Sequence, residues 1–392
     1  MNVLVINAGS SSIKTVLYEC DEFQIERLSE CTASNIGQDR SSIDMMTQTG
    51  DRSSVSTELI DHTAAIGSII NEVPMELVGA IAYRVVYGGV EYFKPTEITD
   101  EVQSRLESFN MIDPEHAPIS SSIIAMLRDR FPDVHHIACF DTAFFHNLPT
   151  LAQIIPIPRI YRDMGIRRFG YHGLSYEYLV DTFGTIAGVD AQHGRVVYAH
   201  LGSGSSIMAT RDGMPVDMTM GLTPTSGLVM GTRTGDVDPS LAWILGNQAD
   251  ISIEKYQYII NHESGLLAVS ELSSDMYALL QNQATNPQAD LAVELFCYQA
   301  RKAIASLSAT IGGIDSLIFS GGMGEQAPEI RRRICEGLEF LGIHIDNDAN
   351  ERADRLFSAP DSKVGVHVIP TDESLSIARS IISMNIINKD IH

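Results

Sequence analysis

Residues 3–18 read VLVINAGSSSIKTVLY, in which two apolar runs flank a small polar turn that contains one glycine. Two β-rich segments joined in this way predict a β-hairpin. The turn offers backbone N–H groups and hydroxyls with little side-chain bulk, which suits the oxygen atoms of a phosphate. Residues 196–207, VVYAHLGSGSSI, repeat nearly the same pattern. We therefore expect a duplicated fold that closes on a nucleotide.

The size and charge of the chain limit its architecture and its partners. Its 392 residues exceed what one hydrophobic core usually supports, so two domains are expected. The 50 Asp+Glu against 27 Lys+Arg give a formal net charge of −23 at pH 7, which repels nucleic acids and anionic membranes. A small anionic substrate is still compatible, because a few arginines and backbone amides can make a cleft locally positive.

The five cysteines form no CxxC pair and no metal-binding spacing with histidine, which favours reduced, buried thiols. The sequence shows no apolar run near the ~18 residues of a membrane span and no secretion-signal pattern, so we expect a cytoplasmic protein. The Ser/Thr/Asp-rich segment 34–57 is expected to be a surface excursion.

One predicted strand carries a charge in its interior. Residues 77–86 are largely apolar, contain Arg84 and run into the glycine pair 88–89. Burying a charge is costly unless it meets an anion or an acid. Arg84 is therefore either half of an internal ion pair or a ligand for a bound anion.

Two carboxylates are predicted to follow strands. An amphipathic helix over 119–130 precedes a strand at 136–140, which delivers Asp141 at its carboxyl end, where ligands of α/β sheets gather. Glu373 follows a predicted strand at 364–369. Such a pair suits a Mg²⁺ ion with water ligands. The alternatives are a helix N-cap for Asp141 and a solvated acid for Glu373.

Two histidines and an arginine stand beside glycine-rich turns in the second half of the chain. His172 is flanked by glycines, His200 precedes the second hairpin turn, and Arg233 lies in the glycine-dense loop 231–239. Loops of this composition are more often functional than structural. Arg233 is thus a better anion ligand than Arg84, while each histidine is either a substrate contact or a hydrogen-bonded core residue.

A third place for a nucleotide is predicted further along the chain. A helix over 291–312 leads to a strand at 316–320, a glycine-rich turn at 321–325 and a helix over 328–341. A closing helix is expected from Leu375 to about residue 387. The sequence contains neither a P-loop pattern nor the GxSxG elbow of serine hydrolases, and the second hairpin lacks the third glycine of a dinucleotide fingerprint.

Four blocks of this chain resemble the acetate kinase family, acyl-phosphate-forming kinases of the superfamily that includes sugar kinases, actin and chaperone ATPases. They are NAGSSSIK at 7–14, FDTAF at 140–144, GTRTGDVDP at 231–239 and EGLEFLG at 336–342. The resemblance extends over residues 2 to about 380. It implies an α/β fold of two duplicated ribonuclease-H-like domains with a cleft between them, and a homodimer. The acyl-side domain would comprise 1–147 and 376–392, and the nucleotide-binding domain 148–375.

The resemblance also implies roles at individual positions. Arg84 and Arg233 match the pair that grips the carboxylate and the transferring phosphoryl group, and Asp141 and His172 match other catalytic positions. Val86, Ile119, Tyr171 and Pro224 match a small apolar acyl pocket. The nucleotide and phosphate positions are Ser10, Ser12, Lys14, His200, Gly202, Ser203, Gly204, Gly321, Gly322 and Gly324, and the metal positions are Asn7 and Glu373.

The implied reaction is reversible, in-line transfer of the ATP γ-phosphoryl group to acetate, giving acetyl phosphate and ADP, with Mg²⁺ or alternatively Mn²⁺. A carboxylate acceptor is already ionised at neutral pH, so the reaction needs no strong general base. Three alternatives stay open: propionate or another short-chain acid as acceptor, a different phosphoryl donor such as pyrophosphate, or a non-catalytic nucleotide-dependent switch on the same fold.

Several positions depart from the family pattern. Histidine is usual or frequent where this chain has Tyr83, Tyr87, Tyr176 and Ser120, and Ser203 replaces the usual asparagine. These departures fall on the acyl and phosphoryl side. They leave the preferred acid open between acetate and other short-chain acids.

Overall fold

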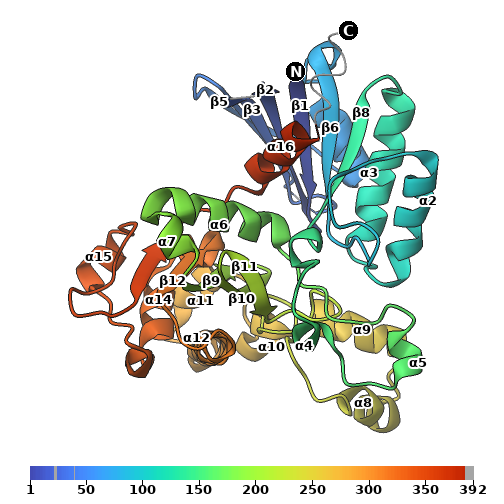
Figure 1. The fold of residues 1–392 in the computed structure, drawn as a ribbon. Coiled ribbons are helices and arrows are strands. Elements are labelled where there is room, and N and C mark those ends of the chain that lie inside the picture. Colours follow the sequence, from blue (N-terminus) through green and yellow to red (C-terminus); the bar gives the residue numbers. More distant parts are fainter. Residues whose placement is uncertain (22–23, 39, 385–392) are drawn as a thin grey trace. The chain divides into compact units, whose positions relative to one another are not determined.

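The computed structural model describes residues 1–21, 24–38 and 40–384. The chain divides into two units, the first made of Met1–His146 with Asp372–His392 and the second of Asn147–Thr371. The division before Asp372, rather than after residue 375 as the sequence predicted, assigns Glu373 to the first unit. Figure 1 shows the elements of both units.

The first unit contains an eight-stranded sheet of order β5-β4-β3-β2-β1-β6-β8-β7. Strand β1 runs antiparallel to β2 and parallel to β6, which is parallel to β8. Helices α1, α3 and α16 pack on this sheet. The strands are β1 (Asn2–Ala8), β2 (Ser12–Cys20), β3 (Ile25–Ser34), β4 (Ser42–Thr47), β5 (Arg52–Ser56), β6 (Val78–Val85), β7 (Thr96–Glu97) and β8 (His135–Phe140).

The second unit contains a five-stranded sheet of order β11-β10-β9-β12-β13. Strand β9 is antiparallel to β10 and parallel to β12, which is parallel to β13. The strands are β9 (Arg195–Leu201), β10 (Ser205–Arg211), β11 (Met214–Met218), β12 (Ser316–Ser320) and β13 (Gly365–Val368). This order and these directions repeat β3-β2-β1-β6-β8 of the first unit. The predicted duplicated α/β fold and both predicted hairpins are therefore confirmed.

Helix α12 (Pro287–Thr310) supplies the main helical surface of the second core. Val293, Phe296, Ala300 and Ile304 are fully buried and recur every three or four residues, which places them on one face against β9 and β10. The helix starts earlier than predicted because the Asn286 side chain accepts hydrogen bonds from two backbone N–H groups of the first turn.

The other described helices are all shorter than α12, and α3 and α6 are the longest of them. They are α1 (His62–Ile70), α2 (Asp100–Ser108), α3 (Ala117–Arg130), α4 (Thr150–Gln153), α5 (Arg159–Arg162), α6 (Gly173–Ala187), α7 (Val189–Gln192), α8 (Leu241–Ala249), α9 (Ile253–His262), α10 (Gly265–Ser270), α11 (Met276–Asn282), α13 (Gly321–Gln326), α14 (Pro328–Cys335), α15 (Asn347–Glu351) and α16 (Glu373–Ser383). Within the described ranges, none of the helices has the length and apolar character required to cross a bilayer.

Three segments differ from the sequence predictions. The expected surface excursion 34–57 forms β4 and the wholly exposed β5, which extend the sheet at its edge. The expected glycine turn 321–325 is helix α13, and the helix that follows it ends at Cys335, before a separate 3₁₀ turn at Glu339–Leu341. The closing helix α16 ends at Ser383, and the predicted residues 385–387 lie outside the described residues.

Candidate active site

Arg84, on β6, is the centre of a polar cluster in the first unit. Its Nε lies 3.2 and 3.1 Å from the two carboxylate oxygens of Asp141, and its Nη2 donates to Asp141 Oδ2 at 2.6 Å. Its Nη1 donates to Asn7 Oδ1 at 3.1 Å and lies 3.6 Å from Glu373 Oε2. Asn7 Nδ2 in turn donates to the same Glu373 oxygen at 2.7 Å. Four side chains thus form one connected network.

The sheet topology explains why these side chains meet. Asn7 stands near the end of β1, Arg84 near the end of β6, and Asp141 directly after β8. These three strands are parallel neighbours, so their carboxyl ends lie at one edge of the sheet. Glu373 joins them as the first residue of α16, which Asp372 caps.

The charges of this cluster depend strongly on one another. Burial acts to lower the pKa of the Arg84 guanidinium, but Asp141 and then Glu373 outweigh burial and hold the pKa above its ordinary value. Burial raises the pKa of Asp141, while Arg84 opposes that rise. Removing one partner of such a buried pair typically costs about 3–5 kcal/mol of stability. The Arg84–Asp141 pair therefore contributes to the stability of the fold as well as to the charge of the site.

Asp141 is not the helix N-cap that the sequence offered as one alternative, because the following 3₁₀ turn has Thr142 at its N-cap. Both carboxylate oxygens of Asp141 contact Arg84. The ion pair is the alternative that the sequence had left open for Arg84. Asp141 orients the guanidinium, and its role towards a metal stays a prediction.

The residues available for a metal ion are Glu373 and Asn7. Among residues 1–21, 24–38 and 40–384, the structure contains no group of three or more His, Cys, Asp or Glu side chains that could hold a metal. Mg²⁺ often keeps several waters and binds through one or two carboxylates together with substrate phosphates. The Glu373 carboxylate fits such a site, with Asn7 fixing one of its oxygens.

A histidine–aspartate contact that the sequence did not reveal lies beside this cluster. His116 Nδ1 and Asp113 Oδ1 are 2.9 Å apart at the start of α3. Asp113 contributes to the electrostatic field at Arg84, and His116 to that at Asp141. Asp113 is also buried. The signal in the sequence was an Asp-x-x-His spacing just before the predicted helix.

The first hairpin turn holds the residues predicted to bind phosphate. Gly9 N–H donates to the Ser12 carbonyl at 2.8 Å, and Ser10 is exposed in the turn between them. The Lys14 ammonium lies 2.9 Å from a Glu30 carboxylate oxygen, a partner that the sequence did not reveal. Because this pair is partly exposed, it contributes only about 0–1 kcal/mol. Of the acyl-pocket residues, this unit carries Val86, buried after β6, and Ile119, half-buried on α3.

The second unit gathers two histidines and an arginine around its hairpin turn. His172 Nδ1 lies 2.9 Å from Ser206 Oγ, and the His172 and His200 ring centroids are 4.6 Å apart. A Cβ at Gly204 would lie 3.3 Å from His172 Nε2 and 3.9 Å from Arg233 Nη1. Glycine at 204 therefore leaves room for His172 Nε2 and Arg233 to face the turn together.

His172 has an unusual backbone conformation for a residue with a side chain. Its φ of 60° and ψ of 27° are left-handed, and it is the N-cap of α6 without a side-chain capping bond. This conformation costs about 1–2 kcal/mol in a non-glycine residue. Strain of this kind is found at functional sites, where the surrounding structure maintains it.

Arg233 and the remaining acyl-pocket residues lie in loops of the second unit. Arg233 Nη1 is 3.3 Å from the Pro224 carbonyl oxygen. The Tyr171 hydroxyl donates to the Leu222 carbonyl at 2.5 Å. That hydroxyl is therefore occupied by backbone, so Tyr171 presents the face of an aromatic ring much as phenylalanine does.

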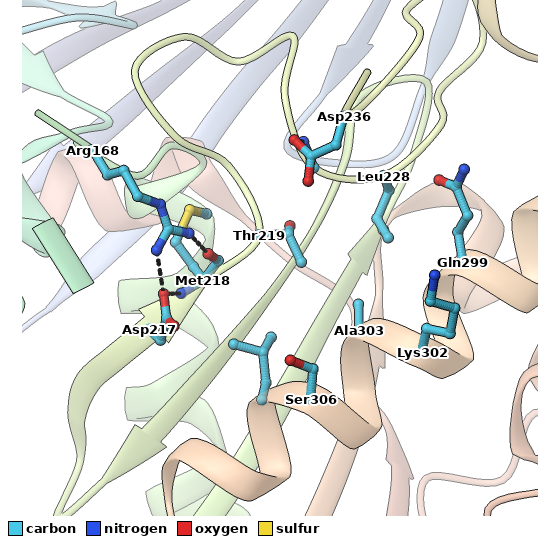
Figure 2. Close-up of a pocket in the computed structure, with 12 residues that line it drawn as sticks. Arg168, Asp217, Met218, Thr219, Leu228, Asp236, Gln299, Lys302, Ala303 and Ser306 are labelled. Atoms are coloured by element: carbon cyan, nitrogen blue, oxygen red, sulfur yellow. Dashed lines mark hydrogen bonds and ion pairs between the residues drawn. The ribbon is translucent and has the colours of Figure 1, made fainter. Parts of the chain in front are cut away.

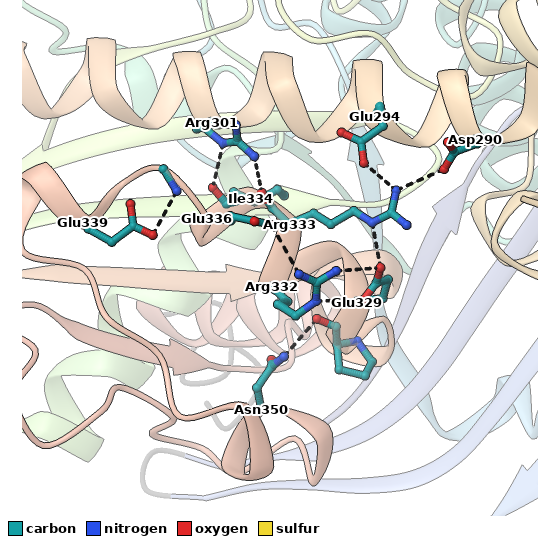
Figure 3. A network of polar contacts seen from close by, with 12 residues as sticks. Asp290, Glu294, Arg301, Glu329, Arg332, Arg333, Ile334, Glu336, Glu339 and Asn350 are labelled. Carbon is teal, nitrogen blue, oxygen red and sulfur yellow. Dashed lines mark hydrogen bonds and ion pairs between the residues drawn. The ribbon is translucent and has the colours of Figure 1, made fainter. Parts of the chain in front are cut away.

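Helix α13, which carries Gly321, Gly322 and Gly324, is fixed at both ends. Glu325 Oε1 accepts from Gly321 N–H at 2.8 Å and from Thr371 N–H at 3.2 Å. At the other end, Arg331 Nη1 donates to the carbonyls of Gly324 and Glu325, both at 2.9 Å. Burial lowers the pKa of the fully buried Arg331 to about 10. Figure 3 shows the neighbouring network, in which Glu329 pairs with Arg332 and Arg333.

Three of the positions that depart from the family pattern have contacts within the first unit. The Tyr83 hydroxyl is hydrogen-bonded to His136 Nδ1 at 2.7 Å. Tyr87 packs edge-on against Phe109. The Ser120 hydroxyl donates to the carbonyl oxygens of His116 and Ala117 at the start of its own helix.

A cavity of about 380 Å³ in the second unit lies between β11, α12 and the loop 227–236 (Figure 2). In it Arg168 Nη1 donates to Asp217 Oδ1 at 2.9 Å. Its lining includes Lys302 and Gln299 from α12, but none of the predicted site residues. This cavity is therefore not the site that the sequence predicted.

The duplicated α/β fold, with arginine, carboxylate and histidine side chains at its strand ends, places the chain among the two-domain kinases of the superfamily that includes actin. The model of the acetokinase family matches residues 2–379, and the chain belongs to that family. It is 40% identical over 391 residues to the acetate kinase of Rhodopseudomonas palustris, covering 97% of each chain.

Two solved structures show the same fold. The acetate kinase of Porphyromonas gingivalis has a TM-score of 0.85 and 32% identity, with 98% of this chain and 99% of that chain covered. A propionate kinase of Francisella tularensis has a TM-score of 0.89 and 31% identity, with 97% and 98% covered. The family resemblance inferred from the four sequence blocks is confirmed.

Proposed function

We propose that this protein is an acetate kinase that transfers the γ-phosphoryl group of ATP to acetate, reversibly and in line, giving acetyl phosphate and ADP. The observation that carries the proposal is the placement of its two arginines. Arg84 is oriented by Asp141 at one set of strand ends, and Arg233 lies beside His172 at the glycine turn of the other. Membership of the acetokinase family supports it.

The chemistry explains why two arginines are needed. Transfer to a carboxylate brings two anions together, and the transition state spreads charge over the oxygens of the phosphoryl group. Catalysis is then chiefly alignment and charge stabilisation. Arg233 and His172 stabilise the transferring group. Both act as hydrogen-bond donors towards it.

Arg84 would orient the acid. A guanidinium has five N–H groups. Asp141 engages Nε and Nη2, while Nη1 donates to Asn7 and lies 3.6 Å from Glu373 Oε2. A substrate carboxylate would be accepted by the terminal nitrogens Nη1 and Nη2, the end of the guanidinium that can bind a carboxylate in a bidentate manner. Asp141 is therefore the residue that aims Arg84.

The nucleotide and the metal complete the proposal. The turn residues Ser10, Ser12, Gly202, Ser203 and Gly204 would hold phosphates with Lys14 and His200, and α13 would lie against the adenosine. The second unit would thus be the nucleotide-binding domain and the first the acyl-side domain. Glu373 and Asn7 would hold Mg²⁺, which when bound neutralises phosphate charge.

The size of the acyl pocket sets the choice of acid. Val86, Ile119, Tyr171 and Pro224 are the side chains proposed to contact the methyl group. A propionate kinase is the second candidate, which the similarity to the Francisella tularensis structure favours. One additional methylene changes binding by only about 1–3 kcal/mol, so turnover with both acids is expected, with acetate preferred.

We also propose a cytoplasmic homodimer. Large apolar side chains are strongly exposed on α4, α5, α8 and α9 of the second unit, and exposed apolar surface marks interaction sites. They include Leu151, Ile160, Trp243 and Ile253, and Met164 just after α5 is exposed as well. Sedimentation should give twice the chain mass. Trp243→Glu with Ile160→Glu should shift the protein to a monomer, and an unchanged mass would place the interface elsewhere.

The five free, buried cysteines suit a reducing compartment, which supports the proposed cytoplasmic location.

The reaction is tested by trapping acyl phosphate with hydroxylamine. Acetate, propionate and butyrate are compared as acceptors, and ATP, GTP and pyrophosphate as donors. We expect the highest turnover with acetate and ATP, and loss of turnover when Mg²⁺ is removed. ATP binding without trapped hydroxamate would instead identify a nucleotide-dependent switch. Preferred turnover of propionate would correct the substrate.

A further inference from the structure

A chain of buried hydroxyls ends on the catalytic histidine. Tyr176, on α6, has its hydroxyl 2.7 Å from Ser206 Oγ, on β10. Ser206 Oγ is also 2.9 Å from His172 Nδ1. Both Tyr176 and Ser206 are fully buried. Tyr176 is one of the positions where this chain departs from the histidine usual in the family.

The donors along this chain can be ordered. A phenol is more acidic than an alcohol and is the better hydrogen-bond donor, which directs the Tyr176 proton towards Ser206 Oγ. A serine hydroxyl has one proton to donate. Since Ser206 accepts from Tyr176, its own proton is directed at His172 Nδ1. Burial raises the pKa of Tyr176, so its phenol keeps the proton at every physiological pH.

We propose that Tyr176 and Ser206 are positioning residues that hold His172 as the neutral tautomer with its proton on Nε2. The inference rests on the proposed function, in which His172 contacts the transferring phosphoryl group. His172 Nε2 is the ring atom that faces Gly204, beside Arg233 Nη1. The hydroxyl chain thus determines what His172 offers at the turn.

The tautomer decides whether His172 helps or hinders the reaction. With the proton on Nε2 the ring donates to an anionic phosphoryl oxygen, as Arg233 does. With the proton on Nδ1 the ring would present a lone pair to that oxygen and repel it. An imidazole at 176 could itself take up a proton near neutrality, whereas a buried tyrosine does not titrate in that range. The tyrosine therefore adds no second titratable imidazole to the hydroxyl chain.

The test reads the tautomer directly and turnover separately. Nitrogen-15 NMR of labelled histidines, assigned with His172→Gln, should show Nε2–H in the wild-type full-length protein. Tyr176→Phe and Ser206→Ala should give a mixture of tautomers. They should lower kcat about tenfold, less than the 10²–10³-fold that loss of a direct donor costs, with KM for ATP and acetate changed less than about twofold. Tyr176→His should add a pH dependence of kcat near neutrality.

Tyr198→Phe is the matched control. Tyr198 is another fully buried tyrosine of the same unit, on β9, and packs against Phe183. The Tyr198→Phe variant should leave the His172 NMR signals and kcat unchanged. Wild-type His172 with its proton on Nδ1, or Tyr176→Phe behaving like Tyr198→Phe in both measurements, would overturn the inference. If Tyr176→Phe does not fold, the tautomer and kcat of Ser206→Ala test the inference in its place. Missing acyl-phosphate formation in the wild type would instead refute the proposed function, and the NMR result would still decide the tautomer.

Discussion

The two sheets have the same strand order but hold their functional groups in different ways. In the first unit, Arg84 is held by charge, between the carboxylates of Asp141 and Glu373. In the second unit, hydroxyl and carbonyl groups hold the site, with Ser206 on His172 and the Pro224 carbonyl on Arg233. The described contacts of Arg84 thus include two carboxylates, whereas those of Arg233 include a backbone carbonyl.

This difference has an energetic consequence. A buried ion pair leaves an uncompensated charge when one partner is removed, whereas a neutral hydrogen bond leaves only a polar group to be satisfied. Substitutions in the first cluster should therefore reduce both folding and turnover. Substitutions in the second should mainly reduce turnover.

The largest effect is expected for Arg84→Ala. It should lower turnover at least about 10²-fold and the free energy of unfolding by about 3–5 kcal/mol, because Asp141 is left buried without its partner. Turnover is measured by hydroxamate trapping and stability by urea unfolding. The double variant Arg84→Met with Asp141→Leu should recover most of the stability but no activity. If Arg84→Ala unfolds at the same urea concentration as the wild type, the ion pair with Asp141 does not stabilise the first unit.

Arg233→Ala should lower turnover about 10²-fold while the free energy of unfolding changes by less than about 1 kcal/mol. The loop loses a charge donor that contacts the Pro224 carbonyl oxygen. Arg233→Lys keeps the positive charge but loses the planar guanidinium, so its turnover should lie between those of the wild type and Arg233→Ala. Near-normal turnover of Arg233→Ala would remove this residue from the mechanism.

Glu325→Ala should raise KM for ATP about fivefold with KM for acetate unchanged. The variant loses the acceptor for the Gly321 and Thr371 N–H groups, and one such hydrogen bond is worth about 1 kcal/mol. Glu325→Gln keeps an acceptor and should be close to wild type. Glu329→Gln, four residues along the chain, is the matched control, since Glu329 contacts Arg332 and Arg333. Equal effects of Glu325→Ala and Glu329→Gln would reject the role of Glu325.

Tyr83→Phe should lower the free energy of unfolding by about 1 kcal/mol and leave turnover unchanged. Its hydroxyl is hydrogen-bonded to buried His136, away from the Arg84 cluster. A changed KM for acetate would show instead that this departure from the family pattern reaches the acyl site.

The smallest effect is a pH dependence of stability. Burial lowers the pKa of His136 in the first unit and of His367 in the second. The unfolded chain then takes up protons more readily than the folded one, so the free energy of unfolding should fall as pH drops below about 6.5. Urea unfolding at pH 7 and pH 5 measures this. His136→Asn should reduce the decline, and an identical decline would assign it to other groups.

Local patterns in the sequence were sufficient for the elements and for several site residues. The two hairpins and the strand that ends before Asp141 followed from apolar periodicity and turn composition, which act over a few residues. Helix α13 was wrongly predicted as a turn because glycines favour turns. The side chains of Glu325 and Arg331 hold its two ends, and their contacts reach as far as Thr371.

The sequence by itself determined the duplicated α/β fold, the family and which residue types stand at the strand ends. Only the tertiary structure decided their partners. Asp141 pairs with Arg84 across 57 positions of the chain, and Tyr176 reaches Ser206 across 30. Such pairs depend on how the strands and helices pack, and the spacing of residues along one chain does not indicate which distant residues will meet. For that reason, the orientation of Arg84 and the hydroxyl chain from Tyr176 to His172 emerged from the folded structure alone.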